Sequence, residues 1–418
     1  MGLLYNSLTT CASGALRLAA SLPIGAKTKR SLKGQIGAIG ELKARFKPQD
    51  GRPVVWFHGS SLGEYAIIKP LIARLKERRP DTQIVLTFFS STGVEALRRR
   101  PNPLVDFCGY LPHDQRKNAR NFLEAKRPSA AVFAVSEYWP NLLEELRRRA
   151  VPTFLVSAIF THRAPHYRAP LADTFRRSLM AYTRIFCLTK SGVANLKSLG
   201  FDRAELVGDP LMDNALATAA APWSDPVIEK FCAGKRVLIA GSISDEKDML
   251  LIAAEVNANP GRHYILVPHE VDQDHLRQVE TTLKVPSARL SDGEVPGGVN
   301  VLIIDNIGTL SRLYRYGAMA YIGGGFSSKL HSLMEATVYG LPVSFGPRTE
   351  RKITPAQTIA LGIGEKVATP GEFRRWADRW FAASDAELAK VSAVALDFCR
   401  SQAGATDHIV TQILNAHD

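Results

Sequence analysis

The stretch P-V-V-W-F-H-G-S-S-L-G-E-Y-A-I-I-K-P-L-I-A-R-L-K-E-R, from Pro53 to Arg78, decides the fold. It opens with a short apolar run, typical of a buried strand, and continues with apolar residues at helical spacing. The same alternation follows through the apolar runs Q-I-V-L-T-F-F, A-A-V-F-A-V, T-F-L-V-S-A and R-I-F-C-L-T. Because parallel strands need helical crossovers, this alternation predicts a doubly wound α/β sheet.

The alternation breaks at 209–235, where D-P-L-M-D-N-A and A-T-A-A-A-P-W-S-D-P indicate a linker and a re-entry helix. It restarts with R-V-L-I-A-G-S, a helix expected over 245–257, and the apolar runs H-Y-I-L-V-P, V-L-I-I-D, A-M-A-Y-I-G-G-G and P-V-S-F-G-P. We therefore predict two doubly wound Rossmann-like domains, at 27–208 and 209–418, preceded by a separate segment at 1–26. Two such halves joined by a short hinge would place a ligand in the cleft between them, at the carboxyl ends of the strands.

The composition excludes several classes of protein. The chain has 418 residues, with 45% hydrophobic and 22% charged, close to globular averages, so it is not wholly disordered, collagenous or fully membrane-embedded. The cysteines are odd in number and form no C-x-x-C pair, which argues against a disulfide scaffold or a thiolate zinc site and favours a reducing compartment. They are Cys11, Cys108, Cys187, Cys232 and Cys399.

The charge is strongly basic, at +13, and residues 1–50 carry eight basic side chains against only two acidic ones. Such an excess implies an anionic partner, which could be nucleic acid, anionic lipid or a phosphorylated substrate. Aromatic residues are not interleaved on a basic strip, and no zinc or helix-turn-helix pattern occurs. We therefore expect no nucleic-acid partner.

The first 26 residues form a distinct segment. Residues 2–26 carry one charge, Arg17, but polar residues such as Asn6 and Thr10 make them a poor spanning helix. The basic run K-T-K-R-S-L-K follows at 27–33, as in an interfacial anchor whose cations lie on lipid headgroups. The alternative is a first helix packed on the core with a solvated basic tail.

Two glutamates directly follow predicted strands. Glu64, in H-G-S-S-L-G-E-Y, is expected in the first turn of a helix, where it could be a general base or a carboxylate favoured by the helix dipole. Glu137, in S-E-Y-W-P, follows the strand A-A-V-F-A-V. A charged residue at that place indicates function, although a capping role is also possible.

The second half contains a glycine-rich turn, Y-I-G-G-G-F-S-S-K-L-H-S-L-M-E-A. We expect Gly323, Gly324 and Gly325 to lead into a helix whose N-terminus binds phosphate, with Lys329 as counter-charge. Glu335, one to two turns into that helix, could accept hydrogen bonds from ribose hydroxyls or lie on a solvated face. Pro268 to Glu270 and Ile307 to Thr309 also follow strands and would border the same pocket, although a lone His269 would ordinarily be structural.

Taken together, these segments resemble the 3-deoxy-D-manno-octulosonic acid (Kdo) transferases, glycosyltransferases of the two-Rossmann GT-B architecture. The resemblance runs from roughly Lys27 to the C-terminus. It is carried by V-W-F-H-G-S-S-L-G-E, P-D-T-Q-I-V-L-T-F-F-S-S-T-G, Y-L-P-H-D, S-E-Y-W-P-N, L-V-S-A-I-F, the G-D-x-x-x-D turn at 208–213, L-I-I-D-N-I-G-T-L-S-R-L-Y-R-Y-G and G-L-P-V-S-F-G-P.

The resemblance implies a function. The family moves Kdo from CMP-Kdo to the lipid A precursor (lipid IVA) at the cytoplasmic face of the bacterial inner membrane, inverting the anomeric centre without a metal or cofactor. It implies that Glu64 deprotonates the acceptor hydroxyl and that Glu137 supports the transition state. The CMP contacts that the family implies, together with the glycine turn and its lysine, give the candidate set Pro268, His269, Ile307, Gly308, Thr309, Gly324, Gly325, Lys329, Ser332, Leu333, Met334 and Glu335.

Three positions depart from the family pattern. Leu211 stands where relatives carry a lysine or arginine that supports the transition state, and Lys190 and Lys329 are candidate replacements. Ser332 stands where relatives have asparagine. No arginine separates Pro268 from His269.

Two other functions stay open on the sequence. One is another GT-B transferase or a nucleotide-sugar epimerase, which S-L-G-E together with S-E-Y-W-P argues against. The other is a non-catalytic lipid-binding protein on a degenerate transferase scaffold, a reading that Leu211 keeps open.

Overall fold

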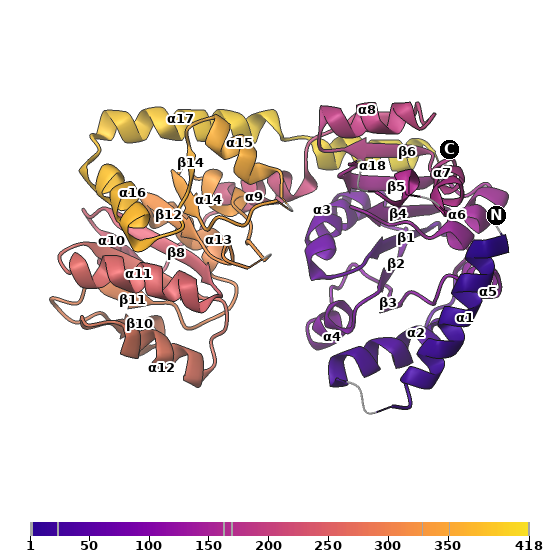
Figure 1. Cartoon of the computed structure of the whole chain (residues 1–418), viewed down its shortest axis with the longest axis horizontal. Helices are drawn as coiled ribbons and strands as arrows, with labels where there is room; N and C mark the ends of the chain where they lie inside the picture. The colour runs from indigo at the N-terminus through magenta and orange to yellow at the C-terminus, as the bar shows by residue number, and fades with distance from the viewer. Residues whose placement is uncertain are drawn as a thin grey trace. The chain divides into compact units, whose positions relative to one another are not determined.

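In the computed structural model, which describes residues 3–22, 25–161, 164–168, 170–327, 329–350 and 352–416, the chain divides into two units (Figure 1). One unit comprises Met1–Asp213 together with Gln402–Asp418, and the other comprises Asn214–Ser401. The C-terminal segment thus returns to the unit in which the chain begins. The boundaries predicted from the sequence, 27–208 and 209–418, separate an acceptor-binding from a donor-binding domain. That division of binding roles stays a prediction.

The first unit contains a seven-stranded sheet whose strands are all parallel: β1 (Val54–Gly59), β2 (Gln83–Phe88), β3 (Phe107–Tyr110), β4 (Ala130–Ala134), β5 (Thr153–Ala158), β6 (Arg184–Cys187) and β7 (Ala204–Leu206). Their order is β3-β2-β1-β4-β5-β6-β7. In β1, Val55 pairs with Ile84 on one side and with Ala130 on the other. The chain winds outward from β1, returns to β4 and winds outward again, so the predicted doubly wound sheet is confirmed.

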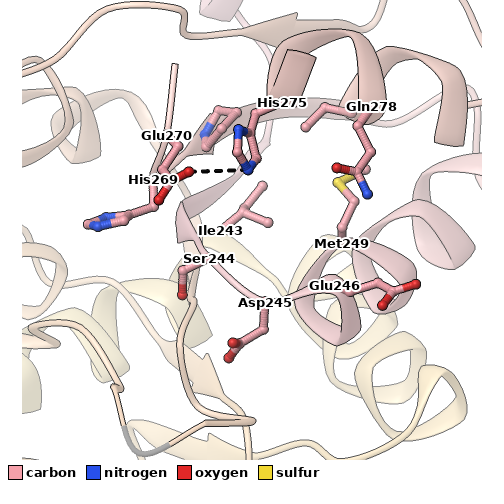
Figure 2. A pocket seen from close by; sticks show the side chains of 11 residues that line it. Ile243, Ser244, Asp245, Glu246, Met249, His269, Glu270, His275 and Gln278 are labelled. Atoms are coloured by element: carbon pink, nitrogen blue, oxygen red, sulfur yellow. Dashed lines mark ion pairs between the residues drawn. The ribbon is translucent and has the colours of Figure 1, made fainter. Parts of the chain in front are cut away.

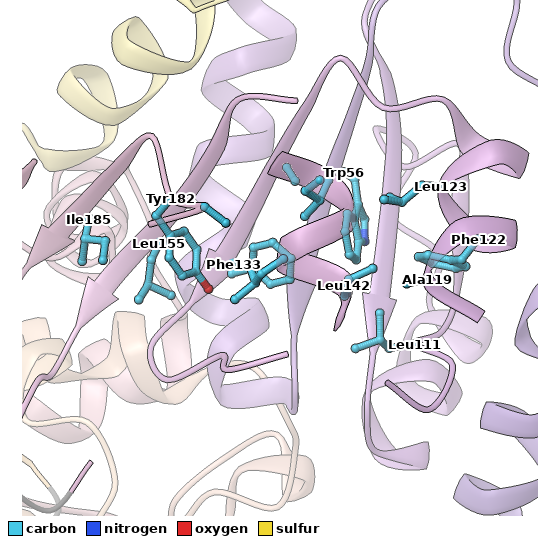
Figure 3. Close-up of a cluster of buried hydrophobic side chains, with 14 of the residues drawn as sticks. Trp56, Leu111, Ala119, Phe122, Leu123, Phe133, Leu142, Leu155, Tyr182 and Ile185 are labelled. Atoms are coloured by element: carbon cyan, nitrogen blue, oxygen red, sulfur yellow. The ribbon is translucent and has the colours of Figure 1, made fainter. Parts of the chain in front are cut away.

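Helices cover both faces of this sheet. Alternate residues of β1 enter two different hydrophobic clusters: the cluster of Trp56 includes residues of α5, α6, α7 and α8, whereas that of Phe57 includes residues of α3, α4 and α18. Figure 3 shows the first cluster, in which Trp56 of β1 contacts Phe133 of β4 and Phe122 of α5. The helices are α1 (Leu3–Ala19), α2 (Ala26–Arg45), α3 (Leu62–Arg78), α4 (Ser91–Arg99), α5 (Arg116–Lys126), α6 (Pro140–Arg148), α7 (Ala172–Leu179), α8 (Lys190–Ser198) and α18 (Ala405–Asn415), with a short 3-10 turn η1 (Pro165–Tyr167).

The second unit contains another parallel sheet of seven strands: β8 (Val237–Ile243), β9 (His263–Pro268), β10 (Ala288–Arg289), β11 (Val301–Ile303), β12 (Met319–Ile322), β13 (Val343–Phe345) and β14 (Gly364–Lys366). Their order is β10-β11-β9-β8-β12-β13-β14. Again neighbouring residues of the first strand enter different clusters, Leu238 with α11, α12 and α16 and Ile239 with α10. The second predicted α/β half is therefore confirmed.

The remaining helices connect these strands. The predicted linker and re-entry region at 209–235 forms α9 and α10, and the helix expected over 245–257 is α11. The bounds are α9 (Pro210–Ala220), α10 (Pro226–Cys232), α11 (Glu246–Ala258), α12 (Gln273–Thr282), η2 (Leu290–Asp292), α13 (Leu310–Leu313), η3 (Tyr314–Tyr316), α14 (Met334–Thr337), α15 (Thr354–Ala360), α16 (Pro370–Ala382) and α17 (Asp385–Ser401).

Helix α1 packs on the first unit by one face. The hydroxyl of Tyr5 donates to Asp114 Oδ2 at 2.7 Å, and Ser13 Oγ lies 3.3 Å from His113 Nδ1. Its other face is exposed and carries Leu4, Leu8 and Leu18. Within the described ranges, none of the helices combines the length and the apolar character that crossing a bilayer requires.

Candidate active site

Glu64 lies in the first turn of α3, as predicted, and its carboxylate takes part in capping the N-terminus of that helix. Ser61 is the N-cap residue, and Glu64 Oε2 accepts hydrogen bonds from the Ser61 hydroxyl and, at 2.8 Å, from the Ser61 amide. These contacts are part of a capping box of the S-x-x-E type. Glu64 Oε1 has no hydrogen bond to a described residue, so one oxygen caps the helix while the other can accept a proton.

Glu137 is buried three residues beyond the end of β4. Val135, the first residue after that strand, has a φ of 71°, a costly conformation for a β-branched residue that turns the chain sharply. Ser60 Oγ donates to Glu137 Oε1 at 2.8 Å, and Trp139 Nε1 donates to Oε2 at 2.6 Å. Burial raises the pKa of Glu137, but the nearby His58 and these hydrogen bonds outweigh burial and hold the pKa below its usual range.

The topology brings the two glutamates to the same edge of the sheet. β1 and β4 are neighbours in space but not in sequence, so the strand order reverses between them. In open α/β sheets, ligands bind outside the carboxyl ends of the strands at such a switch point. Glu64 follows β1 and Glu137 follows β4, which places both carboxylates there.

Leu211, the residue that departs from the family pattern, follows β7 at the same carboxyl edge of the first sheet. Asp209 is buried and accepts hydrogen bonds from Ser157 Oγ at 3.2 Å and from the amide of Leu211 at 3.1 Å. Leu211 packs partly buried against the hydrophobic cluster that contains Phe57. Lys190 is exposed at the start of α8, directly after β6, and so shares this edge.

In the second unit, the strand order reverses between β8 and β12, and an aspartate ties the two following turns together. Asp248 is buried and accepts hydrogen bonds from Tyr321 Oη at 2.6 Å and from the amide of Gly324 at 2.8 Å. Burial raises the pKa of Asp248 despite these hydrogen bonds. Asp245, in the same turn as Asp248, accepts from the amide of Ser327 at 3.1 Å.

The glycine turn differs from the prediction in one respect. No helix follows the three glycines directly: within the described residues, the next one is α14, a single turn that begins at Met334. The amides of Gly323 and Gly324 donate to Gly241 O and to Asp248, so they are used inside the unit. A Cβ on Gly323 would lie 2.2 Å from Ser242 O, which explains why only glycine fits there. The predicted helix N-terminus for phosphate is therefore wrong for this turn.

The other predicted CMP contacts lie at the same edge of the second sheet. Pro268 ends β9, and the ring of His269 lies 4.6 Å from that of His331, centroid to centroid. Burial and the charges of His269 and Lys352 lower the pKa of His331 to about 4. Ile307, Gly308 and Thr309 follow β11, with Ile307 70% exposed and Thr309 bonded to Asn306.

The segment from Lys329 to Glu335 has a mixed environment. Lys329 is exposed, Ser332 and Met334 are half-buried, and Leu333 is buried in the core. Because its side chain is buried, Leu333 can face a ligand only through its backbone. Glu335 lies in the single turn of α14, where burial raises its pKa and Lys352 partly opposes the effect. A fully solvated face for Glu335 is thus excluded.

A pocket of about 220 Å³ lies beside the carboxyl ends of β8 and β9. Asp245, Pro268, His269, Glu270 and His275 form part of its lining. Figure 2 shows the ion pair between Glu270 and His275, whose Oε2 and Nε2 atoms lie 3.2 Å apart. With Asp272 these two residues have the spacing of metal ligands. All three are exposed, however, and Asp272 is the N-cap of α12, bonded to the backbone and ring of His275. The group is explained as a helix cap.

Sequence reasoning assigned no role to several residues of these two edges. His58 and Ser60 lie inside the quoted motif H-G-S-S-L-G-E, yet their contacts with Glu137 depend on strand pairing. Asp245 and Asp248 could have been found, because D-E-K-D after a buried strand has the spacing of a capping box. His331 gave no signal of its own.

Sequence comparison extends these observations. A family model described as "3-Deoxy-D-manno-octulosonic-acid transferase (kdotransferase)" matches residues 37–213. The 3-deoxy-D-manno-octulosonic acid transferase of Chlamydia pneumoniae is 25% identical over 348 residues, covering 80% of this chain and 77% of the relative. The enzyme of that name from Aquifex aeolicus is 26% identical over 326 residues, covering 74% and 82%.

Solved structures share the fold. The UDP-GlcNAc 2-epimerase of Neisseria meningitidis has a TM-score of 0.60 at 14% identity, covering 87% of this chain and all of that one. The α,α-trehalose-phosphate synthase of Burkholderia vietnamiensis has a TM-score of 0.50 at 13% identity, covering 87% and 100%. At such identities the likeness shows the fold alone, a GT-B-like pair of parallel α/β sheets.

Proposed function

The chain belongs to the 3-deoxy-D-manno-octulosonic acid transferase family, and on that premise we propose that it transfers Kdo from CMP-Kdo to the lipid A precursor in lipopolysaccharide core biosynthesis. The observation that carries the proposal is the pair of carboxylates at the switch point of the first sheet. Consecutive serines hold them: Ser60 bonds Glu137 and Ser61 bonds Glu64.

The two glutamates have different environments and so suit different roles. Glu64 is half-buried, and its unbonded oxygen can take the proton of an acceptor hydroxyl, a contribution of about 10²–10⁴-fold to the rate. Glu137 is buried and accepts two hydrogen bonds, which favours a fixed carboxylate that stabilises developing positive charge. The amino acids that surround them therefore support a base and an electrostatic partner.

The second unit supplies the groups proposed to bind CMP. His269, Ile307, Gly308 and Thr309 are solvent-accessible at the carboxyl edge of its sheet, and Lys329 offers an exposed positive charge. Gly325 is the one glycine of the turn whose amide has no partner among the described residues. Pro268, Gly324 and the segment from Ser332 to Glu335 complete the proposed set. The proposed reaction uses no metal or cofactor, as the family resemblance implies.

We place the protein at the cytoplasmic face of the inner membrane, held by α1 and α2. Leu4, Leu8 and Leu18 form an exposed apolar face on α1, while Lys27 and Lys33 are exposed at the start of α2. An apolar face flanked by cations suits the interface of an anionic bilayer. Because the inner face of α1 packs on the first unit, we propose that the segment lies on the membrane surface as part of that unit.

The test is mass spectrometry of a reaction with purified protein, CMP-Kdo generated in situ and the bisphosphorylated tetra-acyl lipid A precursor, with EDTA added once the donor has formed. We expect an acceptor heavier by one or more Kdo residues. No mass shift, with a known transferase active in parallel, would reject the proposal.

A further inference from the structure

His58 is a buried polar side chain to which the reaction as proposed gives no role. It lies in β1, fully enclosed, with the rings of Phe133 and Trp139 packed around it at 5.8 and 6.1 Å between centroids. Its Nδ1 lies 2.9 Å from Thr87 Oγ1, and its Nε2 lies 3.4 Å from Glu137 Oε2. Nε2 has no hydrogen-bond partner in the described part of the chain, so Glu137 is the group it faces.

The partners of Thr87 decide how the imidazole is protonated. Trp56 Nε1 can only donate, and it donates to Thr87 Oγ1 at 2.8 Å. The threonine proton can then go to His58 Nδ1 at 2.9 Å or to the carbonyl oxygen of Phe57 at 3.5 Å, and the shorter contact is the better hydrogen bond. If Nδ1 accepts, the neutral ring must carry its proton on Nε2. That N–H then faces the carboxylate.

Other charged and titratable groups lie near this chain of contacts. Tyr182 donates its phenolic hydrogen to the carbonyl oxygen of Glu137 at 2.6 Å, and Lys126 Nζ lies over the ring of Trp56. Burial lowers the pKa of Lys126 and raises those of Tyr138 and Tyr182, Tyr138 to about 12. Of these titratable side chains, His58 is the one whose ring nitrogen faces the carboxylate of Glu137.

We propose that His58 is a positioning residue for Glu137: through its Nε2 it fixes the carboxylate that Ser60 and Trp139 also hold, in the orientation used for transfer. The inference rests on the proposed function of Glu137. An apolar ring could fill the same space among the aromatic side chains, so packing alone does not require a histidine here. What the histidine adds is its two ring nitrogens, which face Thr87 and Glu137. At 3.4 Å the contact is longer than a good hydrogen bond, and such contacts tighten when substrate binds.

The first experiment compares His58→Phe with His58→Gln. Phenylalanine fills the space without an N–H, whereas the glutamine amide can still donate from about the position of Nε2. We expect His58→Phe to lower kcat by about 10–100-fold, as for other groups that orient a functional side chain, with little change in KM for CMP-Kdo. The acid limb of its pH profile should move to higher pH. His58→Gln should recover most of the loss.

A double-mutant cycle separates positioning from a general structural effect. In a Glu137→Gln background, His58→Phe should cause little further loss, because the carboxylate it positions is gone. An equal loss in both backgrounds would overturn the proposal. So would a His58→Phe protein that keeps the wild-type kcat and pH profile. Thermal unfolding of each variant shows that a lowered kcat comes from folded protein.

A measurement without activity keeps this inference distinguishable from the proposed function. Carboxyl ¹³C NMR of glutamate-labelled protein, with Glu137 assigned by its absence in Glu137→Gln, follows the titration of Glu137. We expect it to titrate at higher pH in His58→Phe than in the wild type. An unchanged titration rejects the role of His58, whereas a wild-type protein that transfers no Kdo rejects the proposed function and leaves the titration result standing.

Discussion

Ser60 donates a hydrogen bond of 2.8 Å to Glu137 across 77 positions of sequence, fastening the turn after β1 to the turn after β4. The next residue, Ser61, caps α3 and holds Glu64. A displacement of this two-serine turn would therefore move both carboxylates together. The geometry of the proposed base and of its electrostatic partner is set by one short segment of chain.

Glu64→Gln should strongly slow transfer and leave the fold intact. Glutamine can occupy the same place in a capping box, so the melting temperature should change little, while the loss of the base should lower the rate by about 10²–10⁴-fold. Glu64→Ala also removes the cap and should cost a further ~1 kcal/mol of stability. Mass spectrometry of the product and thermal unfolding measure the two effects. Retained turnover in Glu64→Gln would eliminate Glu64 as the base.

Gly325→Ala should weaken binding of CMP. A Cβ at this position would lie 2.5 Å from the amide nitrogen of Gly346, so the turn after β12 must shift. Gly261→Ala is the matched control, because nothing lies within 4 Å of its added Cβ. Isothermal titration with CMP should give a weaker affinity for Gly325→Ala alone. Equal affinities for the two variants would place CMP away from the glycine turn.

Lys190 should supply the positive charge that Leu211 lacks. Lys190 is the first residue of α8 and Leu211 the second residue of α9, and these helices follow the adjacent strands β6 and β7 at one edge of the first sheet. We expect Lys190→Ala to lower kcat by about 10²-fold, the loss typical of one electrostatic group, and Leu211→Lys to restore part of it in the same chain. Lys197→Ala, in the last turn of α8, is the control. A wild-type kcat in Lys190→Ala would show that the charge comes from elsewhere.

Replacing Leu4, Leu8 and Leu18 by glutamine should reduce binding to vesicles of phosphatidylglycerol. These side chains are 50%, 49% and 72% exposed, so the change should leave the docked face of α1 and the activity on detergent-dispersed acceptor intact. Leu250→Gln, at a leucine 53% exposed in the second unit, controls for the loss of exposed apolar surface. Undiminished sedimentation of the triple variant with vesicles would remove α1 as the membrane contact.

The stability of the first unit should fall as the pH rises from about 4 to about 6, through Asp114. Burial raises the pKa of this carboxyl to about 6, despite hydrogen bonds from Tyr5 and two backbone amides. The folded state therefore holds a proton that the unfolded chain has already lost, and this stabilisation disappears as pH passes the folded pKa. The total is of the order of 3 kcal/mol, at about 1.4 kcal/mol per pKa unit. Urea unfolding at several pH values should show the slope in the wild type and lose it in Asp114→Asn.

The alternation of strands and helices was predictable because both are local patterns. P-V-V-W-F-H and A-A-V-F-A-V form β1 and β4, and Glu64 and Glu137 follow them as expected. The contacts between distant segments were not predictable. Nothing near Tyr5 indicates Asp114, and nothing near His58 indicates Thr87, because strand order decides which turns become neighbours. The helix expected after the glycines does not form there, since the amides of Gly323 and Gly324 already bond within the unit.

The return of α18 to the first unit has a consequence for how the chain is made. Asp213, the last residue before the chain enters the second unit, accepts hydrogen bonds from the amides of Gly404 and Thr406, just after it leaves. The second unit is thus inserted between two segments of the first unit, and hydrogen bonds join those segments where the insertion begins and ends. The ribosome must therefore synthesise the whole second unit before the first unit can be completed. A fragment that stops at Asp213 would leave Ile68 and Leu71 of α3 without the cover of Ile409 and Ile413.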